Sequence, residues 1–130
     1  MALCIVIRPS KHEVKEVQIK NFRDIQKEIN TEIFDVVSRQ IGTNEYRVYD
    51  IYVDDIGLLK PNPQVSAWGP TDNSTLVGDI LVSLTDYKGD MVDLSQDDIN
   101  YIKDHCHTVI NLDGGEEVIA LFPIYYPTIG

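Results

Sequence analysis

Hydrophobic and polar positions follow two periods along the chain, and each period predicts a different kind of element. The segment 3–7 is short, apolar and rich in β-branched residues, and Pro9 ends it, so we expect a buried strand there. The imperfect alternation over 14–19 predicts a partner strand. Runs of β-branched and aromatic residues at 33–37 and 46–53 predict two further strands.

Two segments have helical spacing instead. Behind the capping residue Asn21, apolar side chains recur on one face, which predicts a short helix over 22–30. Ser95 can cap a second helix over 96–107 in the same way. The apolar stripe of this second helix is expected to consist of Ile99, Ile102 and Cys106.

The second half of the chain is richer in strand patterns. The apolar segment 76–84 is the strongest of them, whereas 54–75 has the composition of turns and is expected to be mostly loop. Strand patterns at 109–112 and 116–122 flank an Asp-Gly step that is typical of a tight hairpin turn. Strands outnumber helices without regular β-α-β alternation. The sequence therefore predicts one α+β domain over 1–130, with a mostly antiparallel sheet, two short helices and a C-terminal hairpin.

Charge narrows the class of function. The 130 residues include 11 basic and 21 acidic side chains, for a net charge of −10. A field of that sign repels phosphate backbones and anionic headgroups, so direct nucleic-acid and membrane binding are disfavoured. No apolar run approaches the ~20 residues of a membrane helix, and the N-terminus lacks a signal-peptide pattern. We expect a cytoplasmic protein in which Cys4 and Cys106 are reduced.

Four segments occur in an order that resembles a known family, and they are residues 5–9, 21–29, 57–63 and 77–82. Together they are similar to a family of small proteins of unknown function carried by bacteriophages and related mobile elements, chiefly of Gram-positive bacteria. The resemblance covers residues 3 to about 105, which leaves 109–130 as an extension. In the loop, this chain has Lys60-Pro61-Asn62-Pro63 where the family typically has two adjacent prolines before the asparagine. The resemblance implies a phage setting in the cytoplasm of a bacterial host, and no established chemistry.

Patterns for catalysis and metal binding are weak. In a helix, the adjacent residues 104–107 would point about 100° apart, so Asp104, His105, Cys106 and His107 cannot all face one ion. The chain has no Gly-x-Ser-x-Gly elbow and no phosphate-binding Gly-x-x-x-x-Gly-Lys loop. We therefore expect a protein without a metal or cofactor that is not an enzyme. An activity through Cys106 and His107 is the catalytic alternative.

A pocket for a small anionic ligand is the first binding hypothesis. Aromatic rings can stack on a base, and Arg or Lys side chains can hold phosphate through charge-assisted hydrogen bonds. In a phage setting, such a protein would counter host defence by sequestering a nucleotide-type signalling molecule. The candidate ligand-binding residues are Arg8, Arg47, Tyr49, Tyr52, Lys60, Asn62 and Trp68.

An acidic surface is the second binding hypothesis. Nine of the 21 acidic residues fall between positions 86 and 117, and their carboxylates could occupy the basic groove of a host DNA-binding protein as a DNA mimic. The same carboxylates also suit a solvated surface that serves solubility alone. The candidate partner-binding residues are Asp90, Asp93, Asp97, Asp98 and Asp104, and Asp97, Asp98 and Asp104 are expected on the exposed face of the second helix.

The last thirteen residues, 118–130, carry no charge and must be covered. They either complete the sheet of the domain itself or form the contact between two copies in a homo-oligomer. Pro123 and Pro127 prevent this tail from forming one regular central strand.

Overall fold

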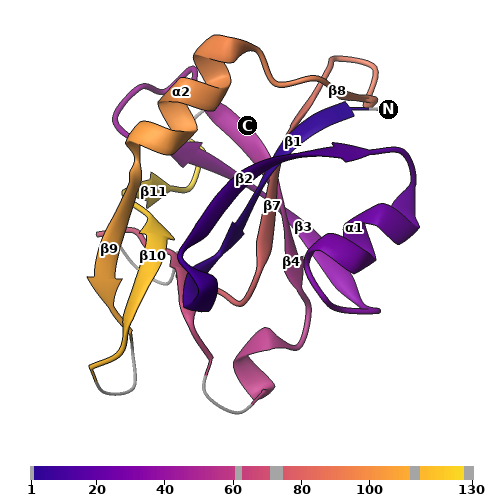
Figure 1. The fold of residues 1–130 in the computed structure, drawn as a ribbon. Coiled ribbons are helices and arrows are strands. Elements are labelled where there is room, and N and C mark those ends of the chain that lie inside the picture. The colour runs from indigo at the N-terminus through magenta and orange to yellow at the C-terminus, as the bar shows by residue number, and fades with distance from the viewer. Residues whose placement is uncertain (1, 61–62, 71–74, 112–114, 128–130) are drawn as a thin grey trace.

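The computed structural model of the chain describes residues 2–60, 63–70, 75–111 and 115–127 (Figure 1). It confirms the predicted α+β class, with two helices and a mostly antiparallel sheet. The elements are β1 (Ala2–Arg8), the 3₁₀ turn η1 (Pro9–Lys11), β2 (Glu13–Ile19), α1 (Phe22–Glu28), β3 (Phe34–Ile41), β4 (Val48–Asp54), the 3₁₀ turn η2 (Gly57–Leu59), β5 (Val65–Ala67), β6 (Leu76–Val77), β7 (Ile80–Thr85), β8 (Met91–Val92), α2 (Gln96–Asp104), β9 (Cys106–Ile110), β10 (Glu117–Leu121) and β11 (Ile124–Tyr125).

The strands form two sheets. The larger has the order β11-β3-β4-β7-β1-β2, with β8 paired to β7, and its described pairings are antiparallel. The smaller has the order β6-β5-β10-β9. Its one described parallel contact places Leu121 of β10 opposite Ala67 of β5.

Strand β1 shows how the sequence builds the layers. Its side chains point alternately to opposite faces of the large sheet. Cys4 and Val6 pack with Ile25 of α1, whereas Ile5 and Ile7 pack in the core that contains α2 and the small sheet. The large sheet is therefore the middle layer, with α1 on one face and with α2 and the small sheet on the other (Figure 1).

The N-terminus of each helix is fixed by the predicted cap. Asn21 Oδ1 accepts a hydrogen bond from Asp24 N at 3.1 Å, which begins α1. Ser95 begins α2 with a capping box, in which Ser95 Oγ accepts from Asp98 N and Asp98 Oδ2 accepts from Ser95 N. Among the described residues, no helix is long and apolar enough to cross a membrane.

The predicted end of the second helix was wrong. The helix stops at Asp104, and Cys106–Ile110 forms β9, whose backbone pairs with β10 over five residues. The predicted C-terminal hairpin is confirmed and begins at Cys106 instead of 109. Residues 112–114 of its turn lie outside the described residues.

Two other predictions need correction. The apolar segment 76–84 does not form one strand, because Gly78 takes a φ of 78° and the chain passes from β6 in the small sheet to β7 in the large one. The described part of 54–75 is mostly loop, as predicted, but it also contains the short strand β5, which pairs with both β6 and β10.

Part of the described tail, 118–127, is buried within the chain itself, whereas Tyr126 is exposed. Ala120 and Leu121 of β10 and Ile124 of β11 are fully buried. Ile124 lies opposite Ile41, so β11 extends the large sheet at β3.

Candidate functional site

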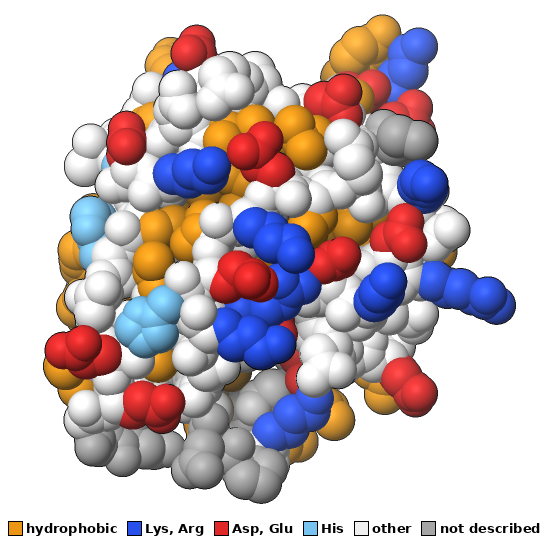
Figure 2. All heavy atoms as spheres, in the orientation of Figure 1, with side chains coloured by type: hydrophobic (Ala, Val, Ile, Leu, Met, Phe, Trp, Pro, Cys, Tyr) orange, Lys and Arg blue, Asp and Glu red, His pale blue; other side chains and the backbone are white. Residues whose placement is uncertain are grey.

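A cleft opens between η1, the C-terminal end of α1, and the segments that follow β4 and β6. Its volume is about 540 Å³. Figure 2 shows Lys and Arg side chains gathered near the centre of this face, between η1 and α1, with carboxylates among them. The ionisable side chains that line the described part of the cleft are Arg8, Lys11, Lys27, Lys60, Glu28, Asp54 and Asp79.

Arg8 joins three walls of the cleft. Its guanidinium forms ion pairs with Glu13 of β2, with Glu28 of α1 at 2.6 Å and with Asp79 at 3.9 Å. Its Nη2 also donates a hydrogen bond to the backbone oxygen of Glu28 at 3.1 Å. That oxygen is one of the carbonyls left without a helical partner at the end of α1, where a cation is favourable. Arg8 is therefore held in place by the fold.

Asp79 is a carboxyl of the cleft whose pKa is raised. Its side chain is 24% exposed and follows Gly78 in the turn between β6 and β7. Burial raises the pKa of this carboxyl, and the charges of Arg8 and Lys11 offset that effect only in part. The Asp79 carboxylate accepts no hydrogen bond from another described residue. A carboxyl with a raised pKa that lines a cleft has the properties of functional sites.

Lys60 is held on the opposite wall. Its Nζ lies 2.5 Å from Asp54 Oδ2, and the Asp54 side chain is only 6% exposed. Burial acts to raise the pKa of Asp54, but hydrogen bonds from Lys60, Ile56 N and Thr31 Oγ1 outweigh it and lower the pKa. Asp54 therefore remains ionised near neutral pH and holds Lys60 in place.

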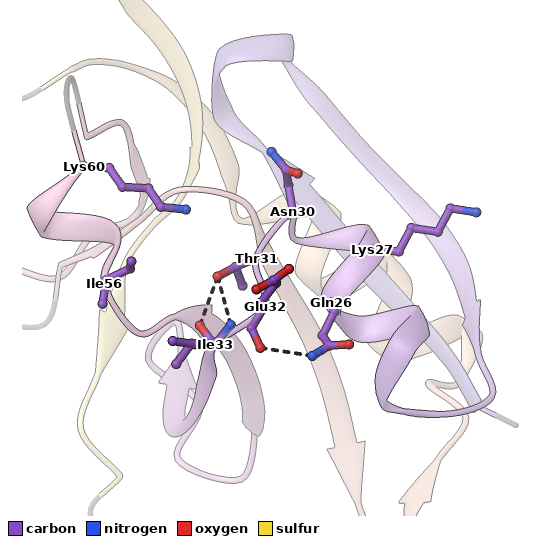
Figure 3. A pocket seen from close by; sticks show the side chains of 8 residues that line it. All are labelled: Gln26, Lys27, Asn30, Thr31, Glu32, Ile33, Ile56 and Lys60. Atoms are coloured by element: carbon purple, nitrogen blue, oxygen red, sulfur yellow. Dashed lines mark hydrogen bonds between the residues drawn. The ribbon is translucent and has the colours of Figure 1, made fainter.

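A second hollow of about 490 Å³ adjoins the cleft and shares Lys27, Asn30 and Lys60 with it. Figure 3 shows Lys60 extending into this hollow, whereas Lys27 extends outward from α1. Ile33 and Ile56 give the hollow an apolar wall, since 56% and 41% of their surfaces are exposed. The cleft and the hollow together form one groove, with a charged lobe and a more apolar lobe.

Hydrogen bonds fix the loop between α1 and β3 that forms the second lobe. Thr31 Oγ1 accepts a hydrogen bond from Ile33 N at 3.3 Å, and Gln26 Nε2 donates to the backbone oxygen of Glu32 at 3.0 Å (Figure 3). Asn30 takes a positive φ of 55°, which asparagine tolerates better than most residues. This wall of the groove is therefore rigid.

Of the predicted ligand-binding residues, Arg8 and Lys60 are brought together in this groove, and Asn62 lies outside the described residues. Tyr49 is 2% exposed and donates its hydroxyl hydrogen bond to Asp98 Oδ1 at 2.6 Å. Arg47 Nη1 donates to the same oxygen at 2.9 Å. Arg47 and Tyr49 therefore fasten α2 to β4 and do not line the groove.

The other two predicted aromatic residues lie in separate places. Trp68 stacks on Phe122 with 4.7 Å between the ring centroids, beside the small sheet. Tyr52 packs edge-on against Phe34 at 5.5 Å and lines another hollow with Phe22, at the start of α1. The described structure does not gather the predicted aromatic and basic residues into one pocket.

Sequence reasoning missed Lys11, Lys27 and Asp79 as residues of the site. The excess of lysines in the first third of the chain was the available signal for the first two. Lys11 and Lys27 come together because Arg8 bonds to the end of α1, and no local pattern shows that contact. Asp79 reaches the cleft because the apolar segment breaks at Gly78.

The acidic candidates do not form a row of free carboxylates. The prediction that Asp98 lies on an exposed face was wrong, because its side chain is 14% exposed and bonded to Arg47 and Tyr49. Asp93 Oδ1 accepts a hydrogen bond from Leu3 N at 2.7 Å and ties the segment before α2 to β1. The remaining candidates, Asp90, Asp97 and Asp104, are exposed.

The geometry gives little support to chemistry at Cys106 and His107. They are neighbours on a strand, so their side chains point to opposite faces. Burial raises the pKa of the Cys106 thiol to about 12, and that of Cys4 also to about 12 with a smaller contribution from Asp93. A thiol with such a pKa is a poor source of the nucleophilic thiolate. Among the described residues, no group of three or more His, Cys, Asp or Glu side chains is placed to hold a metal ion.

Residues 1–107 match a family described as Domain of unknown function (DUF3846). The chain belongs to this family. No curated protein and no solved structure gives a significant match. The matched region contains every residue of the groove and ends within β9, so β10 and β11 lie beyond it.

Proposed function

We propose that the protein acts by binding and not by catalysis, and that the groove holds a small phosphate-bearing ligand of the nucleotide type. One observation carries the proposal: four cationic side chains from separate segments, Arg8, Lys11, Lys27 and Lys60, line a single cleft. The chain as a whole has a net charge of −10. The four cations outnumber the three carboxylates of the same lining, Glu28, Asp54 and Asp79, and this local excess in an acidic protein favours an anionic ligand.

The four cations have two different roles. Arg8 and Lys60 are each held by carboxylates, so their positions are fixed before a ligand arrives, which lowers the entropic cost of binding. Lys11 and Lys27 are exposed and form no ion pair with another described residue. These two lysines are the cations available to neutralise phosphate.

The second lobe suits the rest of a nucleotide. Ile33 and Ile56 offer apolar surface to a ring, and Asn30 offers an amide for hydrogen bonds. The Asp79 carboxylate, in the charged lobe, is an acceptor for a sugar hydroxyl, as carboxylates are in dinucleotide sites. Each lobe falls within the roughly 300–1,000 Å³ typical of small-molecule pockets.

The resemblance to phage-carried proteins supports a biological setting for this activity. In a bacterial host, a small binding protein of this kind would sequester a nucleotide signal and so counter host defence. The other hypothesis, an acidic surface that binds a host protein, rests on Asp90, Asp97 and Asp104, because Asp93 and Asp98 are bonded within the fold.

The test is a comparison of two double variants with the same change in charge. Lys11→Gln with Lys27→Gln removes the free cations of the groove, whereas Lys15→Gln with Lys88→Gln removes two exposed lysines that do not line it. Native mass spectrometry against a panel of linear and cyclic nucleotides identifies the ligand, and calorimetry gives its affinity. We expect the groove variant to bind at least about tenfold more weakly, from the loss of charge-assisted hydrogen bonds.

The control variant should bind like the wild-type protein. Equal weakening in both double variants would show that only the overall charge matters, which contradicts a site in the groove. If the purified protein carries no bound ligand and gains no mass with any nucleotide of the panel, the nucleotide proposal itself is contradicted.

A further inference from the structure

Strand β9 is the outer strand of the small sheet, and it lies at the margin of the molecule in Figure 1. It pairs with β10 on one side, and no described strand pairs with its other side. An unpaired edge presents free N–H and C=O groups, which can pair with a strand of another chain.

The other sheet edges carry features that discourage such pairing. Strand β2 contains the charged residues Glu13, Lys15 and Glu16. Strand β11 is two residues long and lies between Pro123 and Pro127, and β6 is also two residues long and pairs across an irregular register. Strand β9 has five residues and contains no Asp, Glu, Lys, Arg or Pro. The outer side of β3 over 34–39 also has no described partner strand, but this segment contains Asp35 and Arg39. Among the described edges, β9 is therefore the long one without these protective features.

The hydrogen bonds to β10 determine which backbone groups of β9 are free. Asn111 N donates to the Glu116 oxygen at 2.8 Å, and Phe122 N donates to the His105 oxygen at 2.7 Å. Backbone groups alternate in direction along an antiparallel strand. The groups of residues 105, 107, 109 and 111 therefore point toward β10. Those that point outward belong to Cys106, Thr108 and Ile110.

We infer that β9 pairs with β9 of a second copy of the chain, antiparallel and about a two-fold axis at Thr108. In this register Thr108 lies opposite Thr108 of the second copy, and Cys106 lies opposite Ile110 of the second copy. All three outward-pointing residues then form hydrogen-bonded pairs. Moving the axis by one residue leaves one of these three residues without a partner on the other strand. The register centred on Thr108 therefore forms the largest number of hydrogen-bonded pairs.

The side chains of β9 fit this partner. Ile110 is 62% exposed, and Thr108 is also exposed, so pairing covers surface that the single chain leaves open. Facing threonines and facing β-branched side chains stabilise antiparallel pairs. Strand β9 itself contains no Asp, Glu, Lys or Arg, so the pairing places no carboxylate of one β9 strand against a carboxylate of the other. The same surface on both copies makes the contact isologous.

Disulfide formation in Thr108→Cys tests the register. The Cα atoms of a hydrogen-bonded antiparallel pair lie about 5.5 Å apart, which is within the range that a disulfide spans. Under mild oxidation we expect this variant to form a covalent dimer on a non-reducing gel. Thr43→Cys, at an exposed position between β3 and β4, is the matched control and should form no covalent dimer on the same gel. Equal crosslinking in the two variants overturns the register.

Thr108→Pro tests the association itself. The Thr108 N–H points away from β10, so proline removes one outward donor and no hydrogen bond of the single chain. Sedimentation velocity over a range of concentrations should show dimers for the wild type and monomers for the variant, with unchanged circular dichroism. If Thr108→Pro loses its fold, Thr108→Lys provides the same comparison, because an edge lysine opposes pairing. A wild-type protein that is monomeric at about 0.1 mM, or variants that dimerise equally well, overturns the inference.

Discussion

Asp98 and Asp79 are both largely buried carboxylates, yet the fold shifts their pKa values in opposite directions. Burial acts to raise the pKa of Asp98, but hydrogen bonds from Tyr49 and Ser95 and the charge of Arg47 lower it. Burial raises the pKa of Asp79, and nearby cations do not compensate fully. The ionised form of Asp98 thus stabilises the fold, whereas that of Asp79 opposes it. A carboxyl whose ionised form is destabilised by the fold and which lines a cleft fits a role in ligand binding.

Replacing Asp98 tests whether its ionised carboxylate stabilises the fold. Asp98→Ala leaves the buried Tyr49 hydroxyl and Arg47 without their partner, so we expect the free energy of unfolding to fall by about 2–4 kcal/mol at neutral pH. Asp97→Ala, at an exposed position on the same helix, should cost less than about 1 kcal/mol. Urea denaturation measures both values. Equal effects would show that Asp98 acts only as a helix-terminal charge.

The loss of stability in Asp98→Ala is expected to depend on pH. A lowered carboxyl pKa contributes stability above its unfolded value, near about 3.9, and this contribution is lost as the pH falls through the folded value. The difference between the wild type and Asp98→Ala should therefore shrink in acid. A difference that stays constant from neutral to acid pH would contradict the charge-based explanation.

At the scale of elements, the features set by local chemistry were predictable from the sequence. The start of α1 at Asn21 and of α2 at Ser95 depends on side chains within three residues. The helical spacing of Ile99, Ile102 and Cys106 also suggested a longer helix. Pairing with β10 overrides that pattern from Cys106 onward, and a distant partner of this kind is invisible in a local window.

The candidate site was predictable to a smaller degree for the same reason. Arg8 and Lys60 were identified from residue type, and they do line one groove. Arg47 and Tyr49 had equally suitable side chains, but Asp98, about fifty positions further along the chain, binds them both. Residue type indicates which groups can bind phosphate, and only the tertiary fold determines which of them are available.

Substitution of Gly42 tests how closely the turn after β3 packs against α2. It has a φ of 69°, and a Cβ atom there would lie 2.5 Å from Tyr101 Oη and 2.6 Å from His105 Nε2. Gly42→Ala should therefore lower the free energy of unfolding by about 2–3 kcal/mol, since strain and a steric clash add. Gly89→Ala is the control, because Gly89 has a φ of 88° and open space around it. Its expected cost is about 1 kcal/mol, from backbone strain alone.

Chemical denaturation of the two glycine variants gives the comparison directly. Similar losses in both would show that the turn moves away from α2 without penalty, which contradicts close packing at Tyr101 and His105.

At the scale of the whole molecule, the family match ends before the fold does. Residues 1–107 are matched, yet Val118, Leu121 and Ile124 beyond them are fully buried. Each such side chain contributes roughly 1.5–3 kcal/mol, against about 5–15 kcal/mol for a typical domain. The segment after 107 is therefore part of the core in this protein.

Truncation after residue 107 should accordingly prevent cooperative folding. We expect the fragment 1–107 to show no sigmoidal urea transition, because it lacks most of β9 and all of β10 and β11, so that β5 and β3 each lose a partner strand. Leu121→Ala in the full chain serves as the graded comparison, with an expected loss of about 2–5 kcal/mol and a retained fold. A cooperative transition in the fragment would show that 1–107 folds by itself.

The position of β11 has a consequence for the synthesis of the protein. Strands β1 and β2 can pair as soon as they leave the ribosome, but β1 also needs β7, and β3 needs a strand at the far end of the chain. Contacts between segments so distant in sequence form slowly, and chains fold as they emerge only when their partners are already present. The large sheet can therefore be completed only after β11 has been synthesised, and until then the outer side of β3 lacks this partner.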